Sequence, residues 1–349
     1  MGNRVTIQDI ADELGLSRNT VSKALNNSEG IAEATRARII SKAVEMGYKQ
    51  FAYANIVLGG PAGFGQSPAP RFMPAKSEVA LLTTTYLSAP HFSSLMLDRF
   101  QYELSRLGYT LNSHRVTQAN LADHTLPITF DSNRVAAIVC VEMFDFDYDT
   151  MLCSLGIPTL FVDCPAKDRG QSLPSDQLFM DNTTEIVRLV RTKVAEGCRR
   201  VGFVGNHLHC QSFFERYTAF RTAMMLEDLP VRAEDCIPYN LNPEIKAGLE
   251  KLDSLPDLIV CANDFVAIDT LQALRELGKD VPGDVLLAGF DDSAESRLCM
   301  PQLTTIHIHT QVMAYSAVQL LRTRMKEPDL DYRQVYTATD LIERASTKR

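Results

Sequence analysis

The stretch that most constrains the fold is residues 8–25, near the N-terminus (QDIADELGLSRNTVSKAL). Its apolar residues recur at helical spacing, stop at Gly15, and resume on the inward face of a second short helix. Thr6 is placed to cap the first helix, with Asp9 three residues further on, and Ser17 is placed to cap the second. Gly15 allows the left-handed backbone that a tight turn between helices needs. The pattern predicts a helix-turn-helix with apolar positions Ile10, Ala11, Leu14, Val21, Ala24 and Leu25.

The outward face of the second predicted helix carries polar side chains. Arginine, asparagine and lysine pair with guanine and adenine edges in the DNA major groove, and hydroxyl groups contact phosphates. A polar outer face is also common on small helical subdomains, so the pattern alone leaves both interpretations open. The residues on this face are Arg18, Asn19, Thr20, Ser22 and Lys23.

Composition allows two or three domains, because the chain has 349 residues of which 45% are hydrophobic. The net charge of −8 argues against binding to nucleic acid through bulk charge. Residues 1–55, however, carry seven basic and six acidic residues, so the acidic excess lies in the remainder. Affinity for DNA should therefore come from local placement, from helix N-termini and from doubling the DNA-binding unit in a dimer.

The eight cysteines show no C-x-x-C pair, and most lie beside apolar runs. This distribution is typical of small buried side chains in a reducing compartment. The sequence shows no signal peptide and no apolar run of membrane-spanning length. These features predict a soluble, cytoplasmic protein with no membrane contact.

Two runs resemble the headpiece of the lactose/galactose repressor family of bacterial transcription regulators. They are VTIQDIADELGLSRNTVSKALNN (residues 5–27) and TRARIISKAVEMGY (residues 35–48). The resemblance implies a third helix over about residues 33–46 and sequence-specific binding to double-stranded DNA. The DNA contacts that it implies are Thr6, Ser17, Arg18, Asn19, Thr20, Ser22, Lys23 and Asn26.

In that family, a hinge after the headpiece becomes a short helix on DNA and inserts a leucine into the minor groove. Residues 49–58 stand there in this chain, and Val57 or Leu58 is the candidate wedge, although two adjacent β-branched residues disfavour a hinge helix. The next segment, residues 59–74, has glycine or proline at eight of sixteen positions and is predicted to be a linker. The expected domains are residues 1–58 (headpiece and hinge region), 59–76 (linker) and 77–349 (core).

From residue 77 onward, short apolar strands alternate with amphipathic helices. Such alternation gives parallel sheets with helices on both faces, and the length suffices for two lobes. The predicted fold class is α/β: an all-α helix-turn-helix headpiece, then a two-lobed, periplasmic-binding-protein-like core of doubly wound parallel sheets. Ligands of such folds bind beyond the carboxyl ends of the strands, in a cleft between the lobes. Predicted strands cover residues 78–84, 135–141, 159–163, 201–205, 258–262 and 285–290, and predicted helices residues 92–107, 184–196, 215–227 and 265–277.

The core also resembles the effector domain of the same family, through segments that occur in the family's order. They include EGCRRVGFVG (196–205), ER (215–216), ND (263–264), GFDD (289–292) and PQLTTI (301–306). The effector contacts that this resemblance implies are Phe92, Asp163, Arg216, Asn263 and Asp291. A guanidinium, an amide and two carboxylates suit the hydroxyl groups of a sugar or nucleoside. Arg216 and Asp291 could instead form an interlobe ion pair, and Phe92 could be a core aromatic.

We therefore expect a homodimeric transcription regulator, a repressor, that binds a pseudo-palindromic operator. A small-molecule effector, a carbohydrate or carbohydrate derivative, is expected to change the angle between the lobes and thereby the spacing of two headpieces. The alternative is a cytoplasmic sugar- or nucleoside-binding receptor that uses only the core.

An enzyme is disfavoured, because the sequence has neither a nucleophile motif nor a cofactor cradle. Two H-x-H pairs stand out, at residues 207–209 and 307–309. Such a pair is a weak metal signal by itself, and no further ligand is in register with either. We expect no metal and no cofactor.

Overall fold

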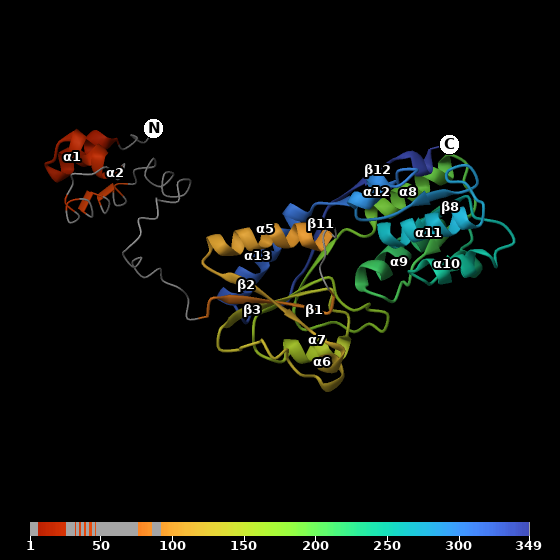
Figure 1. The fold of residues 1–349 in the computed structure, drawn as a ribbon, viewed down its shortest axis with the longest axis horizontal. Coiled ribbons are helices and arrows are strands. Elements are labelled where there is room, and N and C mark those ends of the chain that lie inside the picture. Colours follow the sequence, from red (N-terminus) through yellow and green to blue (C-terminus); the bar gives the residue numbers. More distant parts are fainter. Residues whose placement is uncertain are drawn as a thin grey trace. The chain divides into compact units, whose positions relative to one another are not determined.

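The computed structural model describes residues 6–25, 76–85 and 92–348, and positions 32, 35, 38, 39, 42, 43 and 46. The chain forms two compact units, Met1–Arg71 and Phe72–Arg349, each drawn in Figure 1. Residues 59–75 of the predicted linker lie outside the described residues, and so do Asn26, Val57 and Leu58. The boundary between the units falls within that predicted linker.

The first unit contains the predicted helix-turn-helix, formed by α1 (Ile7–Leu14) and α2 (Arg18–Leu25). Thr6 and Asp9 form a reciprocal capping box, and Gly15 has a φ of 63° at the turn. The Ser17 hydroxyl oxygen accepts a hydrogen bond of 3.1 Å from the backbone N–H of Thr20. The three local signals identified in the sequence therefore fix the beginning of α1, the turn and the beginning of α2.

A small apolar core holds this unit together. Residues 35, 38, 39, 42 and 43 are helical, in agreement with the predicted third helix. Lys42 of that helix lies 3.7 Å from Glu13 of α1. The buried members of this core are Ile10, Ala11, Val21, Ala24, Ile39 and Ala43.

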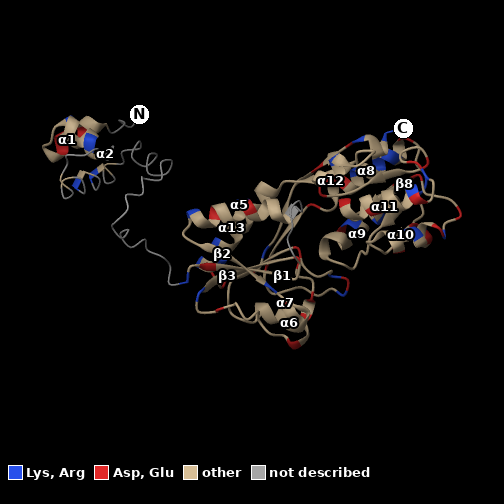
Figure 2. Cartoon of the chain, in the orientation of Figure 1, with Lys and Arg blue, Asp and Glu red and all other residues tan. Residues whose placement is uncertain are grey.

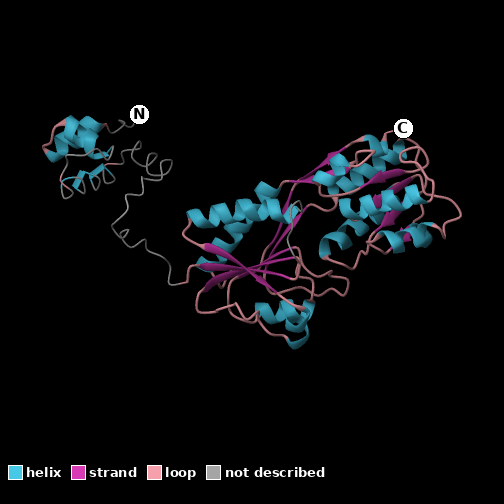
Figure 3. Ribbon diagram, in the orientation of Figure 1, coloured by secondary structure: helices cyan, strands magenta, loops and turns pink. Residues whose placement is uncertain are grey.

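The second unit has two lobes, and lobe 1 is built on a parallel sheet with the strand order β11-β5-β4-β3-β1-β2. Helices α5 (Phe92–Arg106) and α13 (Thr310–Lys326) cover one face, and α6 (Gln118–Asp123) and α7 (Phe146–Cys153) cover the other (Figures 1 and 3). Its strands are β1 (Glu78–Thr83), β2 (Thr110–Arg115), β3 (Val135–Val141), β4 (Thr159–Val162), β5 (Asp176–Met180) and β11 (Gln334–Thr337).

Lobe 2 has a parallel sheet with the order β7-β6-β8-β9 and a separate antiparallel pair, β10 and β12. Its strands are β6 (Val201–Val204), β7 (Cys236–Ile237), β8 (Leu258–Cys261), β9 (Leu286–Ala288), β10 (Thr305–Ile308) and β12 (Thr339–Ile342). Its helices are α8 (Thr184–Ala195), α9 (Gln211–Leu226), α10 (Asn242–Leu249), α11 (Asp264–Glu276) and α12 (Ala294–Leu298), with short 3-10 turns at Ala233–Asp235 and Ala345–Thr347.

The chain crosses between the lobes three times: after β5, between β10 and α13, and between β11 and β12. Two of these crossings are bonded to each other. The backbone N–H of Asp181 donates to the carbonyl of Thr337 at 2.7 Å, and the Thr339 hydroxyl donates to the carbonyl of Asp181 at 3.0 Å. A change in the angle between the lobes must therefore involve these bonded segments.

The α/β class and the parallel sheets are as predicted. Charged residues lie mainly on helices and loops (Figure 2). Helix α9 begins at Gln211, four residues before the predicted beginning at residue 215. The antiparallel β10-β12 pair was not predicted. All eight cysteines are free, and five of them are buried. Among the described residues, no helix has both the length and the apolar character needed to cross a membrane.

Candidate functional site

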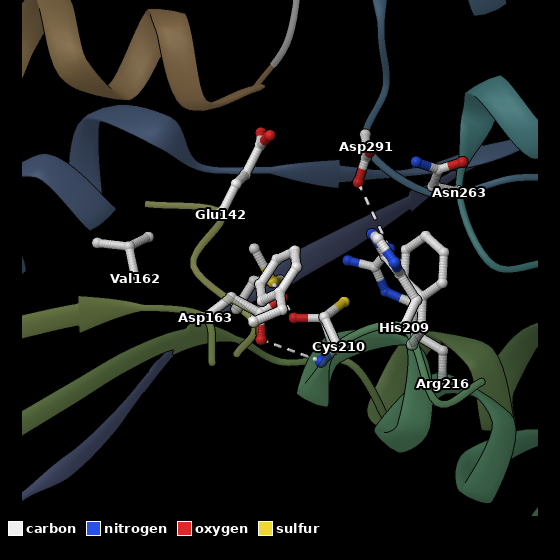
Figure 4. Close-up of a pocket in the computed structure, with 12 residues that line it drawn as sticks. Glu142, Val162, Asp163, His209, Cys210, Arg216, Asn263 and Asp291 are labelled. Atoms are coloured by element: carbon white, nitrogen blue, oxygen red, sulfur yellow. Dashed lines mark hydrogen bonds and ion pairs between the residues drawn. The ribbon is translucent and has the colours of Figure 1, made fainter. Parts of the chain in front are cut away.

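A pocket of about 100 Å³ lies where the carboxyl ends of strands from both lobes meet (Figure 4). Four of the five predicted effector residues line it: Asp163 from lobe 1, and Arg216, Asn263 and Asp291 from lobe 2. Phe92 begins α5, but its side chain lies outside the described part of the chain. The other residues of the lining are Glu142, Phe144, Val162, Met180, His209, Cys210, Ser212 and Phe213.

Arg216 lies on α9, and only 3% of its side chain is exposed. Its guanidinium donates to Asn182 Oδ1 at 2.9 Å and to the carbonyl of Ala262 at 2.7 Å, and it stacks over the Phe290 ring at 3.5 Å. It also lies 3.6 Å from Asp291 Oδ1. The predicted alternative of an ion pair between Arg216 and Asp291 is therefore confirmed, but the pair does not join the lobes, because both residues belong to lobe 2.

Asp291 follows β9, and its buried Oδ1 has no hydrogen-bond partner among the described residues. Burial raises the pKa of Asp291 to about 8, and the charges of nearby carboxylates add to this, whereas Arg216 opposes it. Its φ of 117° lies in a region that residues other than glycine rarely adopt. A ligand that donates a hydrogen bond to Oδ1 would remove part of the free-energy cost of burying this carboxyl group.

Asp163 joins the two lobes. Its Oδ1 accepts hydrogen bonds from the backbone N–H of Cys164 at 2.8 Å and from that of Ser212 at 3.2 Å. Because Ser212 is in the first turn of α9, a carboxylate of lobe 1 caps a helix of lobe 2, which explains the early beginning of α9. Next to it, Gln211 N–H donates to the carbonyl of Cys164 at 2.8 Å. Burial raises the pKa of Asp163, and these hydrogen bonds oppose the shift.

Asn263 is the N-cap residue of α11, and its Oδ1 accepts a hydrogen bond of 2.9 Å from the backbone N–H of Val266. The cap therefore orients the side-chain NH₂ group as the part that can donate to a ligand. Glu142 follows β3, has a φ of 55°, and accepts a hydrogen bond of 2.5 Å from the Thr85 hydroxyl.

The sequence did not predict the other acidic residue and the aromatic residues that line the pocket, which are Glu142, Phe144, His209 and Phe213. Glu142 directly follows the predicted strand at residues 135–141, so the rule that ligand groups follow parallel strands could have found it. In the sequence, His209 stands out only as part of an H-x-H pair. Its ring lies 5.1 Å from that of Phe144 in lobe 1 and 5.4 Å from that of Phe213, and burial lowers the pKa of His209.

The other histidines of the two H-x-H pairs have partners of their own. His307 Nδ1 lies 2.9 Å from Asp292, and His309 Nε2 lies 3.0 Å from Asp340. His207 stacks on a tyrosine ring. Over residues 6–25, 76–85 and 92–348, no group of three or more His, Cys, Asp and Glu side chains is arranged to hold a metal ion.

On α2, Arg18, Asn19 and Lys23 are exposed, and Thr20 and Ser22 are half-buried. The hydroxyl groups of Thr6 and Ser17 serve the helix caps described above, which leaves the three exposed residues as the principal candidates for base contacts.

A helix-turn-helix unit joined to a two-lobed core with a pocket between its lobes defines a class of ligand-responsive regulators. A comparison with protein families supports the same class of protein. Residues 6–50 match "Bacterial regulatory proteins, lacI family", and residues 190–347 match "Periplasmic binding protein-like domain". The chain therefore carries a lacI-family helix-turn-helix domain and a periplasmic-binding-protein-like domain.

Regulators of similar length match nearly the whole chain. The HTH-type transcriptional repressor PurR of Actinobacillus pleuropneumoniae serotype 3 (strain JL03) is 28% identical over 335 residues, which cover 94% of this chain and 93% of the relative. The HTH-type transcriptional regulator GalR of Lacticaseibacillus casei is 27% identical over 360 residues, which cover 98% and 99%.

Solved structures share the fold. A complex of the transcriptional regulator CelR with cellobiose has a TM-score of 0.67 at 20% identity, covering 98% of this chain and 100% of that one. A lac repressor dimer bound to operator and the anti-inducer ONPF also has a TM-score of 0.67, at 19% identity and 99% coverage of both chains.

Proposed function

We propose that the protein is a cytoplasmic, non-enzymatic transcription repressor that reads operator DNA through α2 and binds a small polyhydroxylated effector in the pocket between its lobes. The observation that carries the effector site is the convergence of Asp163, Arg216, Asn263 and Asp291 from both lobes on one pocket. It includes a buried carboxyl oxygen that lacks a hydrogen-bond partner within the described chain.

Such a pocket can couple ligand binding to lobe movement. A volume of about 100 Å³ is below the roughly 300–1,000 Å³ typical of ligand pockets, so a sugar-sized effector requires the lobes to separate. Separation would strain the bonds that Asp163 makes to the first turn of α9. Effector binding would therefore shift the equilibrium between two lobe angles.

The regulatory effect of this shift depends on a homodimer. Two headpieces gain affinity together only while their spacing matches the two half-sites of a pseudo-palindromic operator. Leu95 and Tyr102 on α5 are 62% and 55% exposed, which leaves apolar surface for a second copy of the chain. A relative solved as a dimer on its operator is consistent with this arrangement.

A receptor that uses only the core is the second candidate. It would explain the pocket but would give no role to the exposed arginine, asparagine and lysine of α2. DNA binding separates these two candidates directly.

The test is selection of bound duplexes from a random library by the full chain, followed by footprinting on the recovered sequences. We expect an inverted repeat with two protected half-sites. Recovery of unrelated sequences with uniform affinity would refute operator recognition. Arg216→Ala is the comparison variant: it should select the same repeat, because the change lies in the core and not in α2.

A further inference from the structure

The hydrogen bonds of Arg216 continue away from the pocket, through the segment where the chain first crosses between the lobes. Arg216 Nε donates to Asn182 Oδ1 at 2.9 Å, and Asn182 Nδ2 donates to Glu215 Oε2 at 2.8 Å. Asn182 lies just after β5, at this crossing, and only 1% of the residue is exposed. Because an amide has one oxygen and one NH₂ group, the two bonds together fix its orientation. A displacement of Arg216 therefore acts on Asn182 and, through it, on Glu215.

Glu215 extends these bonds into lobe 1. Its Oε1 accepts a hydrogen bond from the Tyr336 hydroxyl at 2.8 Å and another from Gln211 Nε2 at 2.9 Å. Tyr336 lies in β11 of lobe 1, and its ring stacks on that of Phe179 in β5, with the centroids 5.1 Å apart. Burial raises the pKa of Tyr336, and the hydrogen bond to Glu215 and the charge of that carboxylate raise it further, so the hydroxyl remains a donor. A side chain of lobe 2 is thus bonded to a strand of lobe 1.

Gln211 provides a second bond to lobe 1. Its Oε1 accepts a hydrogen bond of 2.8 Å from the backbone N–H of Lys167, in the loop after β4. The Lys167 ammonium group donates to Gln177 Oε1 of β5, also at 2.8 Å, which ties the loop to the sheet. The residues that lead from Asn182 to Lys167 are all absent from the lining of the pocket. The bonds therefore run from a guanidinium in the pocket to two segments of lobe 1 outside it.

We propose that Asn182 and Glu215 connect the pocket to a latch between the lobes, the latch being the bonds of Glu215 to Tyr336 and of Gln211 to Lys167. While Arg216 is bonded to Asn182, Glu215 is held where it accepts both of its Oε1 bonds, and the lobes stay together. An effector that draws the Arg216 guanidinium toward itself frees Asn182 and weakens the latch. The role of the effector rests on the proposed function, whereas the latch is a property of the ligand-free chain.

Hydrogen exchange of the full, ligand-free chain, read by mass spectrometry, tests the latch. The backbone N–H groups of Lys167 and Ser212 both donate across the boundary between the lobes, so their exchange reports separation of the lobes. Tyr336→Phe removes one hydroxyl group and keeps the ring, and we expect it to raise exchange in the peptides that contain these two residues about fivefold. Tyr332→Phe, at another exposed tyrosine of lobe 1, is the matched control and should change neither peptide. Wild-type exchange in Tyr336→Phe would overturn the latch.

A variant in the pocket tests the connection. Arg216→Met has a side chain of similar length without a donor, and it should raise exchange at Lys167 about fivefold, although Lys167 does not line the pocket. Asn263→Ser changes the pocket but keeps a capping oxygen for α11, and it should leave exchange at Lys167 unchanged. Adding Tyr336→Phe to Arg216→Met should increase exchange little further, because both changes break the same series of bonds. Unchanged exchange at Lys167 in Arg216→Met, or fully additive effects, would contradict the connection.

Two measurements keep these outcomes separate from loss of the fold and from the proposed function. Unfolding midpoints show whether each variant is folded, and Glu215→Gln, which cannot accept from Asn182, Gln211 and Tyr336 together, should raise exchange at Lys167 independently of Arg216. Exchange is measured without effector or operator. A chain that selects no operator would therefore refute the proposed function alone, and unchanged exchange in the variants would refute this inference alone.

Discussion

The carboxyl group of Asp149 offers a quantitative test of the lobe 1 core. Asp149 lies on α7 and is fully buried, and neither carboxyl oxygen has a hydrogen-bond partner in the described chain. Burial, with a smaller contribution from the charge of Asp145, raises the pKa of Asp149 from its ordinary value of 3.8 to about 8. The folded protein therefore retains this proton at pH values where the unfolded chain has lost it.

The sign of the pH dependence follows from this difference. Below pH 3.8 both states are protonated and the group imposes no penalty; between 3.8 and about 8 the penalty on folding grows with pH. The slope is about 1.4 kcal/mol per pH unit, so the penalty should rise by about 3 kcal/mol between pH 5 and pH 7. Asparagine does not titrate, and Asp149→Asn should therefore gain stability relative to the wild type by about this amount over that interval.

Urea unfolding of both proteins at pH 5, 6 and 7 measures the free-energy difference at each pH. The change of this free-energy difference from one pH to another does not contain any constant effect of the amide, such as the hydrogen bonds that the amide itself lacks. Asp147→Asn, at the exposed position two residues earlier in α7, is the matched control and should show only a small effect. A difference for Asp149→Asn that stays constant from pH 5 to pH 7 would refute the reasoning.

Three further predictions concern stability. Burial alone would raise the pKa of Asp176, but hydrogen bonds from Arg324 and Arg333 outweigh burial and lower this pKa. Asp176→Asn should therefore lower the free energy of unfolding at pH 7 by about 3–5 kcal/mol, measured by urea unfolding. This loss should become smaller as the pH falls through 3.8. At Gly205, with a φ of 138°, a Cβ would lie 2.4 Å from the Ala262 Cβ, so Gly205→Ala should cost about 2 kcal/mol or more in the same assay. Thr6→Ala removes the capping box of α1 and should lower headpiece stability by about 1 kcal/mol, measured by hydrogen exchange in α1; unchanged exchange would show that the cap contributes nothing.

Local signals predicted the helix-turn-helix and the strands β1, β3, β4, β6, β8 and β9. Thr6, Gly15 and Ser17 each act within a few residues of their own position, so the sequence alone shows what they do. Strands with continuous apolar runs, such as β3, were also predicted. β2 was missed because its residues are largely exposed at the edge of the sheet and lack an apolar run.

The site required tertiary information that no local pattern contains. Helix α9 begins at Gln211 because Asp163, 48 residues earlier and in the other lobe, caps its first turn. The family resemblance located Asp163, Arg216, Asn263 and Asp291, and the structure brings them together, but their role in binding stays a prediction. Glu142 follows a predicted strand and could have been named from the sequence, but only the structure shows that the ends of β3 and β9 face one pocket.

The most direct test of the central claim, that α2 reads DNA sequence, is the base preference of Arg18→Ala against that of the wild type. Each protein is titrated against the selected operator and against every single-base variant of one half-site, at two salt concentrations. We predict that the variant loses discrimination at one base pair per half-site, by about 1–3 kcal/mol, and keeps it elsewhere. Equal weakening on all sequences, with a smaller salt dependence, would make Arg18 a phosphate contact and would contradict the claim.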